Sequence, residues 1–187
     1  MPDIIRPDDL YLHAQSFHKA AKALAAVFQA GDHLFAQANA SPVVFMYRHA
    51  LELYLKAIVL GDGGNFLAAK PDPISVGKTH SVSWLAQFVC QIVTSLKWQK
   101  EFRCEGVESL ADFKAVVESV ADDPGSYVFR SPVAADEQGI REFARKMDAV
   151  LDLLNVTGDA LAAQWDLRKD GMGIEEDGGS GFGQTIQ

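Results

Sequence analysis

Residues 47–56 have the sequence Tyr-Arg-His-Ala-Leu-Glu-Leu-Tyr-Leu-Lys, and this stretch decides the fold class. Its apolar residues belong to a series with spacings of three and four, which places side chains on one face of an α-helix. The series consists of Val44, Tyr47, Leu51, Leu55 and Ile58. Arg48 and Glu52 fall one helical turn apart on one edge of this stripe, where they can bridge on the surface or point into a groove between helices. The stretch therefore predicts a packed helix with charges beside its apolar face.

Four further segments show helical periodicity, and none shows the alternation that is typical of a strand. They cover residues 10–35, about 79–97, 110–120 and 137–168. The helix around residue 50 is expected to begin at Ser41-Pro42, because serine caps helices and proline fits their first turn. The sequence thus predicts an all-α, up-and-down bundle of about five helices.

Glycine and proline mark the parts that we expect to be non-helical. Residues 61–78 hold four glycines and two prolines, which predicts a long loop after the second helix. The glycine-rich, acidic residues 170–187 predict a disordered C-terminal tail after a single domain at residues 1–169. Gly158 falls near the apolar stripe of the last helix and predicts either a kink or a close contact between helices.

Composition narrows the function classes. The chain has 187 residues and a net charge of -8, which argues against broad, nonspecific nucleic-acid binding but leaves room for a local basic groove. Residues 1–5 lack the pattern of a signal peptide, and the apolar residues 43–60 contain too many charges for a membrane span. Cys90 and Cys104 have no metal or redox spacing. We therefore expect a cytoplasmic protein with free thiols and no membrane association.

Three local patterns occur in order along the chain. The first is residues 47–56; the others are Thr79-His80-Ser81-Val82-Ser83-Trp84-Leu85 and Tyr127-Val128-Phe129-Arg130-Ser131-Pro132. Together, over residues 10–168, they resemble the HEPN-like family of helical bundles. Its members often carry an Arg-His-x-Leu-Glu-Leu-x-Leu-Lys helix, a Gly-His-Asp-Leu-like helix start and a Phe-Arg-Tyr-Pro-like segment. This chain departs from the family pattern at Thr79, Ser81 and Ser131, which replace the glycine, the aspartate and the tyrosine.

The resemblance implies frequent dimerisation and roles in nucleotide or RNA transactions, including toxin–antitoxin and defence systems. Ribonucleases of the family carry an arginine and, four to six residues later, a histidine in the late part of the bundle. The last histidine of this chain is His80, and the one formal match, from Arg6 to His13, lies at the wrong end. We therefore expect a homodimeric, non-catalytic module that binds a nucleotide, RNA or a partner protein. A divergent ribonuclease and a structural partner subunit without a ligand are the alternatives.

Five residues of these patterns are candidates to line one groove: Arg48, Glu52, His80, Tyr127 and Arg130. Two arginines and a histidine suit an anionic ligand such as a nucleotide or an RNA backbone. Each residue also has a structural interpretation. Arg48 and Glu52 can form a salt bridge, His80 can cap or pack, Arg130 can anchor a loop, and Tyr127 can pack with its hydroxyl hydrogen-bonded.

Two other motifs do not predict sites. Gly77-Lys78-Thr79 is similar to the end of a phosphate-binding loop, but Asp72 stands where that motif needs glycine, and no strand precedes it. The pair His49-x-x-Glu52 is a single, reversed copy of a motif that di-iron bundles use twice. We therefore predict no metal site, no cofactor and no catalytic triad.

Overall fold

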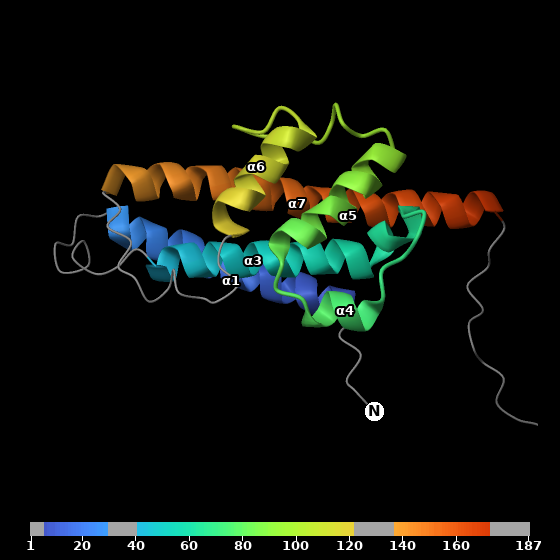
Figure 1. Ribbon diagram of the computed structural model, residues 1–187, viewed down its shortest axis with the longest axis horizontal. Coiled ribbons are helices and arrows are strands. Elements are labelled where there is room, and N and C mark those ends of the chain that lie inside the picture. The colour runs from blue at the N-terminus through green and yellow to red at the C-terminus, as the bar shows by residue number, and fades with distance from the viewer. Residues whose placement is uncertain (1–5, 30–40, 122–136, 173–187) are drawn as a thin grey trace, which may run out of the picture.

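The computed structural model describes residues 6–29, 41–121 and 137–172, and its regular structure there is helical (Figure 1). The elements are α1 (Pro7–Gln29), α3 (Ser41–Leu60), the 3-10 helix η1 (Asp62–Phe66), α4 (Pro73–Lys78), α5 (Val82–Ser95), α6 (Leu110–Ala121) and α7 (Glu137–Met172). The predicted all-α bundle is confirmed. Residues 30–35 of the first predicted helix and most of the predicted tail lie outside the described residues, and α7 continues four residues past its predicted end at 168.

Three long helices lie side by side, and α5 and α6 cross over them (Figure 1). Hydrogen bonds between the long helices show in which direction each helix runs. Tyr11 reaches the carbonyl of Leu154 while His18 reaches Asp148, so α1 runs antiparallel to α7. Tyr47 contacts Asp148, and Tyr54, two turns later, contacts Asn155; hence α3 runs parallel to α7. The up-and-down arrangement thus involves α1, α3 and α7.

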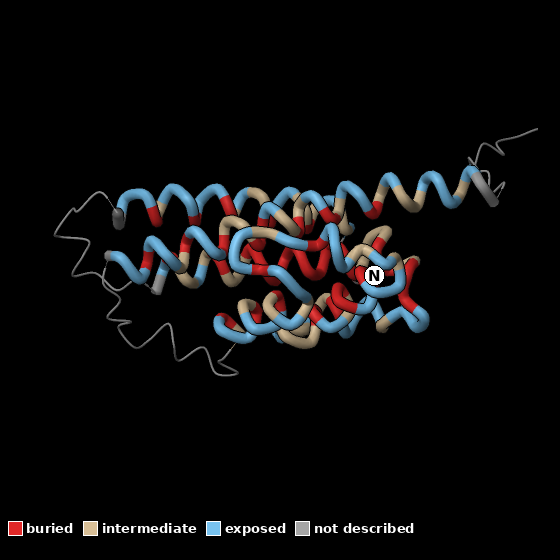
Figure 2. Tube along the Cα trace, turned by 90° about the horizontal axis from the view of Figure 1, so that it is seen from above, coloured by how far each residue is buried: buried red, intermediate tan, exposed pale blue. Residues whose placement is uncertain are grey.

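Helix α3 occupies the centre of the bundle. Every residue from 51 to 59 is buried, because α1, α5 and α7 surround this part of the helix. Figure 2 shows the same pattern around it, with buried positions on the inner sides of the long helices and exposed positions outside. The predicted stripe is buried from Tyr47 to Ile58, whereas Val44 is only half-buried and Val43 packs inside instead. Two charged residues of this part of α3, Glu52 and Lys56, are therefore buried as well.

The prediction of one long loop at residues 61–78 is wrong in part, since η1 and α4 form within it. Helix α4 begins at Pro73, whose fixed backbone angle suits a first helical turn. Asp72 precedes it as the N-cap, and its carboxylate accepts hydrogen bonds from the backbone N–H groups of Ile74 and Ser75. The residue that argued against a phosphate-binding loop therefore starts a helix, and this helix delivers residues 77–80 to the flank of α3.

Gly158 marks a close contact between helices. A Cβ atom placed on Gly158 would lie 1.2 Å from the hydroxyl oxygen of Tyr11. Helix α7 is continuous through this position, so the close-contact alternative is the correct one. The missing side chain lets the Tyr11 ring lie against α7 and hydrogen-bond to the Leu154 carbonyl oxygen at 3.4 Å. Across the described helices, none is long and apolar enough to span a bilayer.

Candidate functional site

Three successive turns of α3 present a charged residue to the segment that connects α4 with α5. Arg48, Glu52 and Lys56 lie at i, i+4 and i+8, and His80 approaches them from the connecting segment. We call these four residues the Glu52 cluster. Glu52 is its centre, because each of the other three side chains lies within 4 Å of its carboxylate.

The inner half of the cluster is a buried ion pair. The side chains of Glu52 and Lys56 are only 3% and 6% exposed. The Lys56 ammonium donates to Glu52 Oε1 at 2.8 Å and to the carbonyl oxygen of Gly77 at 3.0 Å. Burying charges costs several kcal/mol per ion in general, and close pairing with further hydrogen bonds offsets that cost. This pairing fixes α3 against residue 77.

The outer half of the cluster reaches the surface. Arg48 donates from its Nη2 to the carbonyl oxygen of His80 at 3.1 Å, and its Nη1 lies 3.8 Å from Glu52 Oε2. The Nδ1 of His80 lies 3.1 Å from Glu52 Oε1. A carboxylate only accepts hydrogen bonds, so Nδ1 carries the proton in this contact. The His80 side chain is 78% exposed and that of Arg48 17% exposed, which makes them the accessible edge of the cluster.

Positive charge exceeds negative charge at this site. Arg48 and Lys56 contribute a guanidinium and an ammonium group, whereas Glu52 is the one carboxylate of the cluster. The same charges affect the pKa of His49, which lies on the same helix. Burial lowers its pKa most, and the charges of Lys56, Arg48 and His80 lower it further, against an opposing effect of Glu52. The region is therefore locally basic on a chain whose net charge is -8.

An aromatic group adjoins the charges. His49 packs edge-to-face on Phe17 from α1, with ring centres 4.3 Å apart. It also stacks on Phe45, with ring centres 5.8 Å apart and the planes 5° from parallel. Phe45 is 41% exposed, so its ring borders the solvent one turn before Arg48. Aromatic faces next to cations suit ligands that combine a ring with a negative charge.

The structure brings together three of the five predicted site residues, Arg48, Glu52 and His80. Tyr127 and Arg130 lie outside the described residues. Lys56 was not predicted as part of the site, although it continues the spacing of four that links Arg48 to Glu52 and could have been found from it. The carbonyl groups of residues 77 and 80 left no signal in the sequence, because their position depends on α4.

A second polar cluster joins the three long helices. The Asp148 carboxylate on α7 accepts a hydrogen bond from the Tyr47 hydroxyl at 2.8 Å and one from His18 Nε2 at 2.9 Å, both on Oδ1. Lys22 and Asp152 extend this group toward the surface. We call these five residues the Asp148 cluster. Tyr47 and His18 are buried, and burial and the contact with Asp148 raise the pKa of the Tyr47 hydroxyl.

Comparisons with known proteins do not identify the chain. No family model, no curated protein and no solved structure matches it. Within the described ranges, no three histidine, cysteine or acidic side chains are grouped as a metal ion would require. The likeness to HEPN-like bundles therefore stays a prediction from three motifs, and function has to be argued from the geometry of the Glu52 cluster.

Proposed function

We propose that this chain is a non-catalytic module of the HEPN-like type that binds the phosphate of a nucleotide or of RNA at the exposed edge of the Glu52 cluster. One observation carries the proposal. A guanidinium, an ammonium and an exposed imidazole gather around a single carboxylate, on a chain whose net charge is -8. Toxin–antitoxin and defence systems are the setting that the family resemblance implies.

The donors that remain suit a phosphate group. A guanidinium has five N–H donors in a planar fork that matches phosphate oxygens. Among the described residues, the Arg48 guanidinium contacts the His80 carbonyl and, more distantly, Glu52. Glu52 holds the imidazole of His80 from the Nδ1 side, which leaves Nε2 for a ligand. Lys56 is buried and its ammonium is already bound to Glu52 and Gly77, so it adds positive charge near the ligand without contacting it.

The small number of positive side chains at this edge predicts that RNA binding depends only weakly on salt concentration. A ligand phosphate would meet the one or two positive side chains of this edge, rather than an extended basic surface. For a single strand, we expect the logarithm of the association constant to fall with the logarithm of salt concentration by a slope of about -0.7 to -1.4. A steeper slope would indicate a larger basic surface elsewhere.

Fluorescence anisotropy with a labelled single-stranded RNA and competition by unlabelled nucleotide test the proposal. His80→Ala should weaken binding several-fold, while His13→Ala, which removes an exposed histidine from α1, serves as the matched control. Arg48→Gln should weaken binding further, with Arg6→Gln, at an exposed ion pair, as its control. Equal affinity of all four variants, or no binding by the wild-type chain, would overturn it. Sedimentation of the same samples tests the proposed homodimer.

The contact between His80 and Glu52 also favours a second candidate, a divergent ribonuclease. A carboxylate that orients an imidazole next to an arginine is an arrangement used in general acid–base catalysis. In the structure, 3.1 Å separates His80 Nδ1 from Glu52 Oε1, and Arg48 contacts both residues. Gel analysis of the RNA after incubation separates the two candidates. Cleavage that disappears in His80→Ala supports the ribonuclease, whereas intact, bound RNA supports the binding module.

A further inference from the structure

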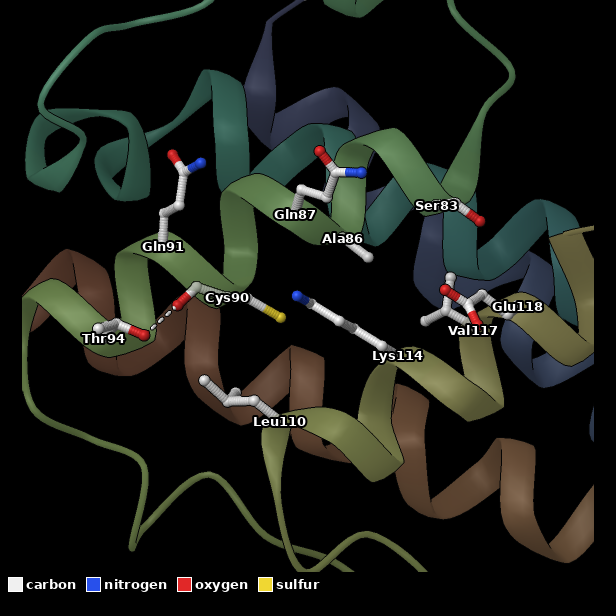
Figure 3. A pocket seen from close by; sticks show the side chains of 10 residues that line it. All are labelled: Ser83, Ala86, Gln87, Cys90, Gln91, Thr94, Leu110, Lys114, Val117 and Glu118. Atoms are coloured by element: carbon white, nitrogen blue, oxygen red, sulfur yellow. Dashed lines mark hydrogen bonds between the residues drawn. The ribbon is translucent and has the colours of Figure 1, made fainter.

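A groove of about 470 Å³ lies between α5 and α6, on residues that the Glu52 cluster does not include (Figure 3). One side consists of polar side chains of α5, among them Ser83, Gln87 and Gln91, and the other side belongs to α6. Sites for small organic molecules in proteins occupy about 300–1,000 Å³, so this groove has the size of a ligand site.

Small residues keep the groove open. Along the groove face of α5, Ala86 and Cys90 form the floor, opposite Leu110 and Val117 of α6. The large apolar residues of α5, such as Leu85, are buried within the core and leave this face. The side chains of Ala86 and Cys90 are short, so they leave space above them between α5 and α6. The groove therefore follows from the side-chain sizes along α5.

Lys114 supplies a positive charge that pairs with no side chain in the part of the chain that the structure describes. Its side chain extends from α6 into the groove, with the ammonium toward the thiol of Cys90 (Figure 3). Among the residues that the structure describes, no carboxylate lies within 4 Å of this ammonium, and no hydrogen bond to it occurs. Glu118, one turn further along α6, forms no ion pair with it either. Lys114 is exposed, so its solvated ammonium stands at the open side of the groove, where an anion that enters the groove can replace water on it.

Cys90 is a neutral part of the floor. The residue is 6% exposed, and its thiol is directed into the groove. Burial raises the pKa of the thiol more than the charge of Lys114 lowers it. A protonated thiol is a poor nucleophile, so the groove is suited to reversible binding rather than to a covalent step. The thiol offers an apolar surface and a weak hydrogen-bond donor to a ligand above it.

We propose that the α5–α6 groove binds a small organic anion, with its carboxylate or phosphate group on the Lys114 ammonium and its body along Cys90 and Val117. The side-chain amides of Gln87 and Gln91 then donate to and accept from polar groups on that body. This site is separate from the Glu52 cluster and does not depend on the function proposed for it.

NMR titration of the full chain tests the proposal with two probes, adenosine monophosphate and the dipeptide N-acetyl-alanyl-alanine. Binding in the groove shifts the side-chain amide signals of Gln87 and Gln91. We expect at least one probe to produce saturable shifts at millimolar concentration, and the chargeless amide of the dipeptide to produce none. The probe that acts tells phosphate from carboxylate ligands. If neither probe moves these signals, the proposal is overturned.

Variants separate this site from other binding. Lys114→Gln should abolish the shifts, while Lys100→Gln, which removes an exposed lysine elsewhere, should leave them unchanged. His80→Ala should also leave them unchanged, even if it abolishes RNA binding at the Glu52 cluster. As a second readout, a bound probe should slow alkylation of Cys90 at least several-fold and spare Cys104, the half-buried internal control. Shifts that persist in Lys114→Gln would contradict the assignment of the anion to that ammonium.

Discussion

The Glu52 cluster and the Asp148 cluster, which share helix α3, are built in different ways. The Glu52 cluster gathers opposite charges, joins residues at most 32 positions apart, and ends in an exposed histidine. In the Asp148 cluster, the Asp148 carboxylate accepts from the buried side chains of Tyr47 and His18, which lie 101 and 130 positions away in sequence. Its own opposite charges, Lys22 and Asp152, are exposed and lie at its outer side. One cluster therefore fixes a connecting segment to a single helix, whereas the other fixes three long helices to one another.

The difference bears on what each cluster is for. Replacing a buried ion pair by well-packed apolar residues is often neutral or stabilising, so such a pair is weak evidence for a role in stability. Buried hydroxyl and imidazole groups, in contrast, reduce stability when they have no hydrogen-bond partner, so their hydrogen bonds to Asp148 support the folded state. This comparison assigns cohesion of the bundle to the Asp148 cluster and leaves the Glu52 cluster as the candidate for function. Three of the predictions that follow test this division, and the one at Gly158 tests the α1–α7 contact outside both clusters.

Alkaline pH should reduce the stability of the bundle most, because it ionises several buried tyrosines at the interface of the long helices at once. Burial is the main cause that raises the pKa of Tyr11, Tyr47 and Tyr54, in the case of Tyr54 to about 12. In the unfolded chain tyrosine loses its proton near pH 10, so above that pH the folded state binds more protons than the unfolded state. The stability that these neutral tyrosines contribute is complete below about pH 10 and is lost as the pH rises toward 12 and beyond.

Absorbance of tyrosinate and circular dichroism, followed together, check this expectation. The chain has four tyrosines, of which Tyr127 lies outside the described residues. Three tyrosines should ionise only together with the loss of helical signal. Ionisation of all four near pH 10 with the helices intact would show that the α1–α3–α7 interface is more open than the structure indicates.

Glu52→Ala should cause the next largest loss, because it leaves Lys56 buried without its carboxylate. Removing one partner of a buried ion pair costs about 3–5 kcal/mol of unfolding free energy in general. Urea denaturation measures the change. The double variant Glu52→Leu with Lys56→Met should recover most of the loss, since apolar side chains of similar size can fill the same space. A double variant as unstable as the single one would show that the ions themselves are needed for folding.

The sequence predicted three residues of the Glu52 cluster, Arg48, Glu52 and His80, and missed the Asp148 cluster for a physical reason. Arg48 and Glu52 are four residues apart on one helix, and helical geometry alone makes such residues neighbours. The partners Tyr47 and Asp148 meet only after α7 packs against α3, and no local spacing encodes that contact. Periodicity likewise predicted the long helices well. It failed at α4, where the signal is a cap, Asp72, and a proline rather than an apolar stripe.

Gly158→Ala should cause a smaller loss, at the contact between α1 and α7. The new Cβ would lie 1.2 Å from the Tyr11 hydroxyl and 2.2 Å from the ring carbon that carries it, so the ring has to move. Overpacking of this kind costs about 1–3 kcal/mol. The better helix propensity of alanine, about 1 kcal/mol, offsets part of that cost.

Thermal and urea unfolding of Gly158→Ala, of Tyr11→Ala and of the double variant measure this contact. If the clash is responsible, adding Gly158→Ala to the Tyr11→Ala background should be neutral or stabilising, because the ring is no longer there. The two substitutions are then strongly non-additive. Additive losses in the double variant would contradict the close contact and point to a separate need for glycine within α7.

His80→Ala should have the smallest effect on stability and for that reason divides structure from function most cleanly. Its side chain is 78% exposed, and Glu52 keeps its hydrogen bond from Lys56, so the substitution removes one hydrogen bond, which contributes about 1 kcal/mol in general. The carbonyl group that Arg48 binds belongs to the backbone of residue 80 and survives the substitution. A variant with near wild-type unfolding but weaker RNA binding would separate the exposed edge of the Glu52 cluster from its buried half. If unfolding and binding change together by a large amount, the cluster is one structural unit, and the ligand has to be sought elsewhere on the chain.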